Sequence, residues 1–144
     1  MPPSSRHDPL SGFNIQIEIN GIAAAGFSEC SGLSSETDVV EYREGGDRRV
    51  RLLPGLTRFG RIVLRRGITA DRALWDWRQT VVNGTADRRS GSVILLDAER
   101  NEVARWNFFE AWPSKWVGPD LNAQSSEVAI ETLEIAHEGL EWAN

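Results

Sequence analysis

The sequence predicts a mainly-β domain of two packed antiparallel sheets or a barrel, with a single α-helix on its flank. Three observations support this fold class. Apolar and polar residues alternate with period two in several segments, turn residues separate those segments, and helical periodicity occurs in one segment alone. The 144 residues suffice for one domain with a buried core, and 40% hydrophobic with 26% charged residues excludes the disordered class.

The predicted strands follow from this alternation. The first begins at Phe13 and ends at Asn20-Gly21, whose residues both tolerate positive φ and therefore predict a hairpin turn. Residues 1–12 contain three Pro, three Ser and a Gly and predict a mobile arm, so the single predicted domain covers residues 13–144. The strands predicted along the chain cover residues 13–19, 22–30, 34–44, 61–68, 93–96, 102–112 and 126–137.

The one predicted helix runs from Thr69 or Ala70 to Asn83. Thr69 or Asp71 can cap its N-terminus, and Gly84 stands where a left-handed residue commonly ends a helix. Apolar residues recur along one side, as expected for a helix that covers a sheet. The residues of that apolar side are Leu74, Trp77 and Val81, with Trp75 and Val82 beside them.

Two predicted features concern the C-terminal third. Pro113 is expected to interrupt its strand, with residues 115–122 irregular after it. In the last strand the apolar residues change phase, since Val128 and Ile130 share one face and Leu133 and Ile135 the other. Either a β-bulge near Glu131-Thr132 reconciles them or both faces are covered.

The segment Gly45–Gly60 shows no clear periodicity and is predicted as a long loop. It combines several arginines with large apolar residues, a composition that disordered linkers rarely have. A loop that packs against another surface is therefore expected. The residues expected to make that contact are Arg48, Arg49, Arg51, Leu52, Leu53, Arg58 and Phe59.

The net charge of −5 is unevenly distributed along the chain. Residues 43–66 hold eight Arg against two acids, a net of +6, whereas residues 1–42 and 127–144 each carry a net of −5. Such a layout suggests surfaces of one copy that meet surfaces of another, with ordinary surface charge as the plain alternative. Six Trp in a small domain favour the same interpretation, because Trp is enriched at the centres of interfaces.

Catalytic chemistry has little support in the sequence. His7 lies in the predicted arm, and Cys30 with His137 is the one conceivable nucleophile and base, although ordinary structural roles fit both better. No phosphate-binding, zinc-protease, nucleophile-elbow or calcium-loop motif occurs. We therefore predict no enzyme activity, no metal and no cofactor. The basic block also leaves nucleic-acid binding open, but Tyr42 and Phe59 are its few aromatic companions and its flanks are acidic.

Across residues 8–142 the sequence resembles the tail-tube subunits of contractile-tailed phages and related contractile injection systems. The resemblance lies in eight motifs that occur in order along one domain. Two residues depart from the family pattern. Arg100 stands in a turn that more usually holds Gly, and Cys30 is unusual in its strand. The matching segments are Gly12-Phe13 with the Asn20-Gly21 hairpin, Val40–Gly46, Leu64–Ile68, Leu74–Trp77, Val103–Phe108, Ala111–Trp116, Gly118–Asn122 and Glu127–Glu131.

The resemblance implies hexameric rings that stack into a hollow tube, whose lumen is a β-barrel shared by six copies. It further implies a sheath around the tube, baseplate or hub proteins, a tail terminator or cap, and DNA or protein cargo in the lumen, with no membrane anchor. By position, Gly45–Gly60 matches the family's loop that reaches a neighbouring subunit. Charged residues on the third and last strands are candidates to face the lumen, namely Glu41, Arg43 and Glu131.

Assembly in the cytoplasm is expected, because residues 1–8 are polar and lack the apolar core of a secretory signal. The finished protein is then part of a phage tail or of an injection-system particle. A secreted ring-forming tube protein of a related bacterial secretion system is the main alternative. A small nucleic-acid-binding β-barrel is a weaker one, and a hydrolase is the weakest.

Overall fold

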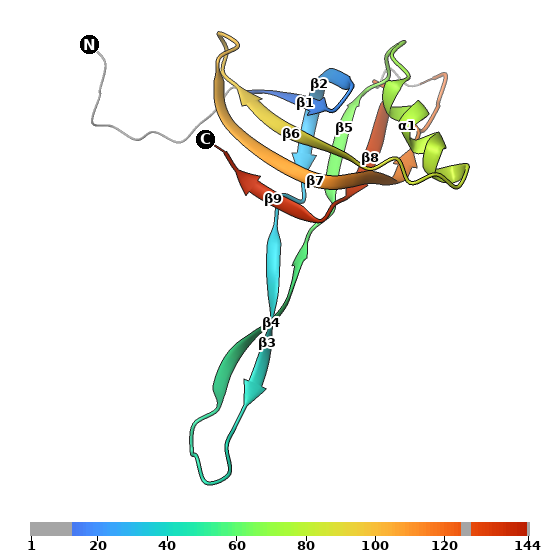
Figure 1. Cartoon of the computed structure of the whole chain (residues 1–144). Helices are drawn as coiled ribbons and strands as arrows, with labels where there is room; N and C mark the ends of the chain where they lie inside the picture. The colour runs from blue at the N-terminus through green and yellow to red at the C-terminus, as the bar shows by residue number, and fades with distance from the viewer. Residues whose placement is uncertain (1–12, 125–127, 144) are drawn as a thin grey trace, which may run out of the picture.

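The computed structural model describes residues 13–124 and 128–143. Most of this chain forms one antiparallel sheet with strand order β6-β1-β2-β5-β8-β7-β9, and a further pairing of β6 with β7 closes it into a barrel (Figure 1). The predicted mainly-β, barrel-like fold with one flanking helix is confirmed. The elements are β1 Asn14–Ile19, β2 Ile22–Ser31, β3 Ser35–Tyr42, β4 Arg51–Phe59, β5 Ile62–Gly67, α1 Ala73–Val82, β6 Arg89–Leu96, β7 Glu102–Val117, β8 Ile130–Ala136 and β9 Gly139–Trp142. The proposed arm, residues 1–12, lies outside the described residues.

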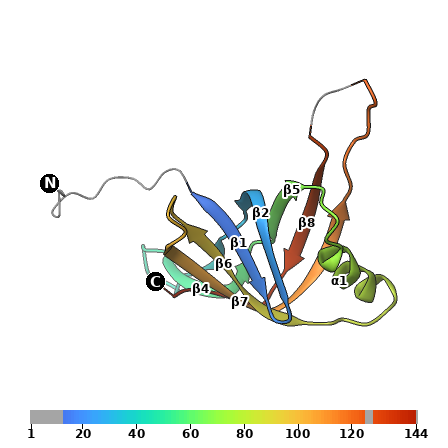
Figure 2. The same cartoon turned by 90° about the horizontal axis from the view of Figure 1, so that it is seen from above.

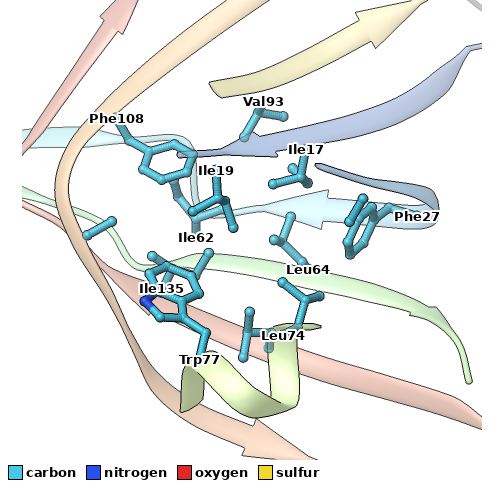
Figure 3. Packing of buried hydrophobic residues seen from close by; sticks show 13 residues of the cluster. Ile17, Ile19, Phe27, Ile62, Leu64, Leu74, Trp77, Val93, Phe108 and Ile135 are labelled. Atoms are coloured by element: carbon cyan, nitrogen blue, oxygen red, sulfur yellow. The ribbon is translucent and has the colours of Figure 1, made fainter. Parts of the chain in front are cut away.

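The core fills the barrel and is drawn from nearly every strand around it (Figure 3). The period-two alternation of the sequence places its apolar residues on the inner face, because successive side chains of a strand point to opposite sides. Ile17, Phe108 and Ile135 have no exposed surface. The remaining members of the cluster are Ile19, Ala24, Phe27, Ile62, Leu64, Leu74, Trp77, Val93, Ala111 and Leu133.

Helix α1 completes the core at one end of the barrel, beside β7 and β8 (Figure 2). Leu74 and Trp77 are buried, as the apolar periodicity predicted, and the Trp77 indole Nε1 donates a hydrogen bond to the carbonyl oxygen of Asp87 over 2.8 Å. The Asp71 carboxylate accepts a hydrogen bond from the Ala73 amide at 3.0 Å, so Asp71 supports the first turn. Gly84 takes the predicted left-handed conformation, with φ 93°.

Strand β7 is longer than predicted, because Pro113 does not interrupt it. The strand pairs with β6 as far as Ala111 and with β8 from Trp112 onward, so Pro113 lies where β7 changes partner. The pairing with β8 is irregular between Pro113 and Lys115. A proline without an amide hydrogen is tolerated at such a break in the ladder. The prediction of an irregular segment directly after Trp112 was therefore wrong as far as Val117.

The predicted β-bulge near Glu131-Thr132 is absent, since β5 and β8 pair in continuous register from Ile62↔Ile135 to Gly67↔Ile130. The core face of β8 consists of Glu131, Leu133 and Ile135. The apparent change of phase arose because the inward position before Leu133 holds a charged residue and Val128 lies outside the strand. Strand β9 was not predicted; it pairs with β7 and extends the sheet beyond the barrel.

The prediction that Gly45–Gly60 is a long loop was wrong for residues 51–59. Residues 51–59 form β4, which pairs with β3 in a two-stranded sheet that projects from the barrel (Figure 1). The turn-like Pro54-Gly55 lies inside β4, where the register shifts opposite Thr37–Val39. A bulge at this point hid the alternation from a sequence-based prediction. We refer to residues 35–59 as the β3–β4 hairpin and to residues 43–51 as its tip.

Candidate self-assembly surface

The β3–β4 hairpin concentrates exposed apolar side chains, because seven of the fourteen large hydrophobic residues that are exposed in the described chain lie in it. Every described residue of β4 before Phe59 is exposed, and Leu56 and Leu52 retain 73% and 67% of their surface. Contiguous exposed apolar surface on a projecting element marks an interaction site. The exposed large apolar residues of this hairpin are Val39, Val40, Tyr42, Val50, Leu52, Leu53 and Leu56.

Both faces of the hairpin carry these side chains. Cross-strand partners share a face, and Val40 is paired with Leu53 whereas the adjacent Val39 is paired with Pro54. Because neighbouring residues of a strand point to opposite sides, the two pairs lie on opposite faces. A hairpin with one face on water normally alternates apolar and polar residues. This one has the pattern of a strand pair that is covered on both sides.

The tip is basic. It contains four arginines against Glu44 and Asp47. The Arg43 Nε donates a hydrogen bond to the Asp47 carbonyl oxygen at 2.7 Å, and the Asp47 carboxylate accepts one from the Arg49 amide at 3.0 Å. Within the described part of the chain, the guanidinium groups of Arg48, Arg49 and Arg51 form no ion pair. These three cations are therefore available to a partner.

Much of the charge complementarity seen in the sequence is used inside the chain instead. The basic block continues up to and into β5: Arg61, just before the strand, pairs with Glu134 at 3.4 Å, and Arg66 within it pairs with Glu131 at 2.6 Å. Both carboxylates belong to β8, the antiparallel neighbour of β5. The sequence could not distinguish these contacts from contacts between copies, because it does not show which strands lie side by side. Of the basic block, the arginines of the tip remain available to other chains.

The base of the hairpin is firmly attached to the barrel. The His137 ring bridges it, with Nε2 2.9 Å from the Gly60 carbonyl oxygen and Nδ1 2.9 Å from that of Gly139. The Phe59 ring lies 5.6 Å from the His137 ring, and the Gly60 amide donates to the Ser34 carbonyl oxygen at 3.0 Å. A side chain at Gly32 would overlap the Arg61 carbonyl, so the two strands approach closely there. The hairpin thus leaves the barrel in a fixed direction.

The predicted contact residues divide into two groups in this geometry. Arg58 pairs with Asp38 at 2.6 Å, and Phe59 is half-buried against His137, so both serve the hairpin itself. The other predicted contact residues, Arg48, Arg49, Arg51, Leu52 and Leu53, are all exposed. Sequence reasoning missed the apolar residues of β3. The adjacent pair Val39-Val40 was the available signal, because it places apolar groups on both faces of one strand.

The three residues predicted to face a lumen lie in different surroundings. Glu41 is exposed on β3, and Arg43 is exposed at the start of the tip. Glu131 lies inside the barrel instead, with its side chain 10% exposed against a 3% exposed Arg66. A carboxylate held there does not reach a channel surface.

Glu131 belongs to a buried polar network that joins four elements. Its second carboxylate oxygen accepts a hydrogen bond from the Trp116 indole at 3.0 Å, and Arg66 also donates to the Asp71 carbonyl oxygen at 3.3 Å. The Arg66 guanidinium lies 5.3 Å from the centre of the Phe27 ring. The network therefore holds β5, β7 and β8 to the segment that starts α1, and each buried charge has a partner, as burial requires.

Among the described residues, Cys30 and His137 are in surroundings that fit structural roles better than those of a nucleophile and a base. Burial raises the pKa of the Cys30 thiol from 9.0 to about 11, which disfavours the nucleophilic thiolate. The His137 ring is engaged with two carbonyl oxygens. In residues 13–124 and 128–143, no group of three His, Cys, Asp or Glu side chains is placed to hold a metal ion. The one helix that the structure describes is not long and apolar enough to cross a membrane.

The described residues thus form a small closed barrel from which a long hairpin with exposed apolar side chains projects. Residues 11–141 match the family model of the T4-like virus tail tube protein gp19. The chain belongs to this family, which confirms the resemblance seen in the sequence. The family is one of structural tube proteins.

Solved structures agree with this assignment. A chain in the cryo-EM structure of the anti-feeding prophage (AFP) baseplate, 6-fold symmetrised, is similar with TM-score 0.80 and 27% identity, covering 96% of this chain and 97% of that one. A chain in the sheath–tube complex of the extracellular contractile injection system PVC gives TM-score 0.83 and 20% identity, covering 99% and 97%. Hcp1 from Flavobacterium johnsoniae shares the fold at TM-score 0.57 and 20% identity, covering 90% and 94%. Among curated proteins, none matches the chain.

Proposed function

We propose that this chain is a non-enzymatic protomer of an inner tube, in which hexameric rings stack into a hollow conduit for DNA or protein cargo. The observation that carries the proposal is the β3–β4 hairpin, which has exposed apolar residues on both faces and three arginines that form no ion pair with the residues the structure describes. The family model and the 6-fold symmetrised relative support a ring of identical copies. In a ring of this kind each hairpin covers a neighbour, and residues 13–144 act as one structural unit.

The mechanical task follows from the same features. A closed barrel has few free edges, and a fixed hairpin base transmits force between subunits without bending at a hinge. We infer that the tube lies inside a contractile sheath, ends in a baseplate or hub and a terminator or cap, and is assembled in the cytoplasm. The similar chains come from baseplate, sheath–tube and terminator complexes, which supports these partners.

Two of the three lumen candidates remain part of the proposal. Glu41 and Arg43 are exposed and of opposite charge, so a channel wall that contains them is polar without a strong net charge. Such a wall lets cargo pass without binding it tightly. Glu131 is excluded because it is buried with Arg66.

The decisive test is negative-stain electron microscopy of the purified full chain over a range of concentrations. Rings with an open centre, and tubes made of stacked rings, are the expected result. Compact monomers under every condition, in microscopy and in size-exclusion chromatography, would refute the proposal. The secreted ring-forming alternative is less well supported, since the Hcp1 structure is less similar than the injection-system chains. Sheathed particles in the source cell would separate the two.

A further inference from the structure

A second surface of the barrel, formed by β9 and its neighbour β7, complements the hairpin, because it exposes aromatic side chains and is acidic. Strand β9 ends the order of the large sheet and lies at the side of the barrel, whereas the hairpin of the same chain points away from the barrel (Figure 1). The hairpin tip is therefore out of reach of its own β9. Any contact between the two has to be made between different copies.

The core face of the barrel runs out into solvent along β9. Phe108 is paired with Leu140 and Trp106 with Trp142, so these four side chains share one face. Phe108 has no exposed surface, Leu140 is half-buried and Trp142 is 68% exposed. The Trp106 and Trp142 rings lie 5.3 Å apart, which leaves a broad aromatic surface at the end of the row. Large aromatic side chains exposed in this way are typical anchors of protein interfaces.

The charge of this surface is opposite to that of the tip. Residues 137–142 carry Glu138 and Glu141 and no arginine or lysine. The Glu138 side chain is 64% exposed, and its ion pair with Arg88 is loose at 3.5 Å. Glu141 is exposed and accepts a hydrogen bond of 3.2 Å from the Asn107 amide. Unlike Glu131 and Glu134, these carboxylates are therefore still able to pair with arginines of another chain.

We propose that β9, with its aromatic row and its two glutamates, is the docking site for the β3–β4 hairpin of a second copy. The inference rests on the proposed function, because it presupposes that copies of the chain assemble. Leu53 and Val40, which share one face of the incoming hairpin, cover Leu140 and the Trp106–Trp142 pair, and tip arginines pair with Glu138 and Glu141. The hairpin of one copy and β9 of another are different patches, so the contact is heterologous and closes a ring when the rotation between copies allows it.

A charge-swap experiment on the full chain tests the site. The hairpin variant Arg48→Glu/Arg49→Glu/Arg51→Glu and the β9 variant Glu138→Arg/Glu141→Arg are each expected to raise the concentration for half-assembly by about tenfold or more. The variant that combines all five substitutions is expected to recover most of the lost assembly, because both charge patterns are then reversed together. Glu99→Arg/Asp120→Arg serves as the matched control, since it changes the same number of exposed acids elsewhere and should leave assembly within about twofold.

The outcomes separate this site from the proposed function. If the wild-type chain never assembles, both the docking site and the proposed function are refuted. If the hairpin variant weakens assembly but the β9 variant does not, or if the combined variant shows no recovery, β9 is not the docking site and the tube function stands. A photo-crosslinking measurement is independent of charge: Leu53→p-benzoylphenylalanine is expected to link to residues 138–142 of another copy. Crosslinks that map to any other segment overturn the site.

Discussion

Strands β4 and β5 follow each other directly, yet they have opposite relations to water. Leu64 of β5 is 1% exposed, whereas Leu56 of β4 is 73% exposed. Both strands combine large apolar residues with two arginines, so composition does not separate them. The difference is the neighbour: β5 lies between β2 and β8 in a closed sheet, and β4 has β3 alone. The barrel is complete within one chain, and the hairpin requires other chains for its core.

Charges divide in the same manner. Arg66 of β5 and Arg61 just before it pair with glutamates of β8, one pair facing the core and one facing solvent, whereas Arg48, Arg49 and Arg51 of the tip form no ion pair within the described residues. An isolated two-stranded hairpin is marginal in water. The hairpin therefore contributes little to the stability of the single chain and most of its contacts to the assembly. Four predictions test this division, from the largest expected effect to the smallest.

The largest effect is expected at the buried pair of the barrel. Replacing Glu131 by Ala leaves the Arg66 guanidinium buried without its carboxylate and should lower the free energy of unfolding by about 3–5 kcal/mol. Glu134→Ala is the matched control on the same strand. Its partner Arg61 is 65% exposed, so the loss should stay below about 1 kcal/mol. Urea denaturation of the monomeric chain measures both, and equal losses would contradict the assigned roles.

A leucine pair addresses the comparison directly. Leu64→Ala should lower the free energy of unfolding by about 2–5 kcal/mol, because it opens a cavity in the core. Leu56→Ala should change the stability of the single chain by less than about 0.5 kcal/mol, since the side chain is already in water. In sedimentation experiments on assembled protein, Leu56→Ala is expected to weaken assembly more than Leu64→Ala does, provided that both variants are folded. A large destabilisation of the monomer by Leu56→Ala would show that the hairpin packs on its own barrel.

A smaller effect concerns a turn of the barrel. Arg100 has φ 64° in the turn between β6 and β7, a left-handed conformation that glycine adopts without strain. Arg100→Gly should therefore raise the free energy of unfolding by about 0.5–1 kcal/mol. Glu99→Gly, in the same turn, relieves no such strain and should lower it slightly. Thermal unfolding followed by circular dichroism distinguishes the two. A loss of stability in Arg100→Gly would disprove the assignment of strain.

The last prediction, which has no effect at neutral pH, is a pH dependence at Cys30, close to the junction with the hairpin. Its pKa is raised from 9.0 to about 11 by burial, so the folded state favours the neutral thiol. The resulting stability is complete below pH 9 and is lost as the pH rises from about 9 to 11. Wild-type protein should lose stability over this interval relative to Cys30→Ser. Parallel pH profiles for the two proteins would show that the thiol is not desolvated.

The local elements were largely predictable from the sequence. Alternating residues located the inward faces of β1 and β5, Asn20-Gly21 located the first hairpin, and the spacing of Leu74 and Trp77 gave the buried side of α1. These features depend on residues near each other in the chain, and a local pattern therefore suffices. The family motifs identified the class of protein for the same reason, since they are short and occur in order.

Contacts between distant segments were decided by the tertiary structure alone. The sequence by itself determined that a basic block and an acidic C-terminal segment exist. It did not determine that β5 lies beside β8, or that two arginines of the block pair with glutamates of β8 within the chain. It also presented Glu131 as a surface charge, because nothing local shows that Arg66 is paired with it across the ladder. The energy of a charge depends on its surroundings, and those surroundings arise only when the barrel closes and the hairpin is left outside it.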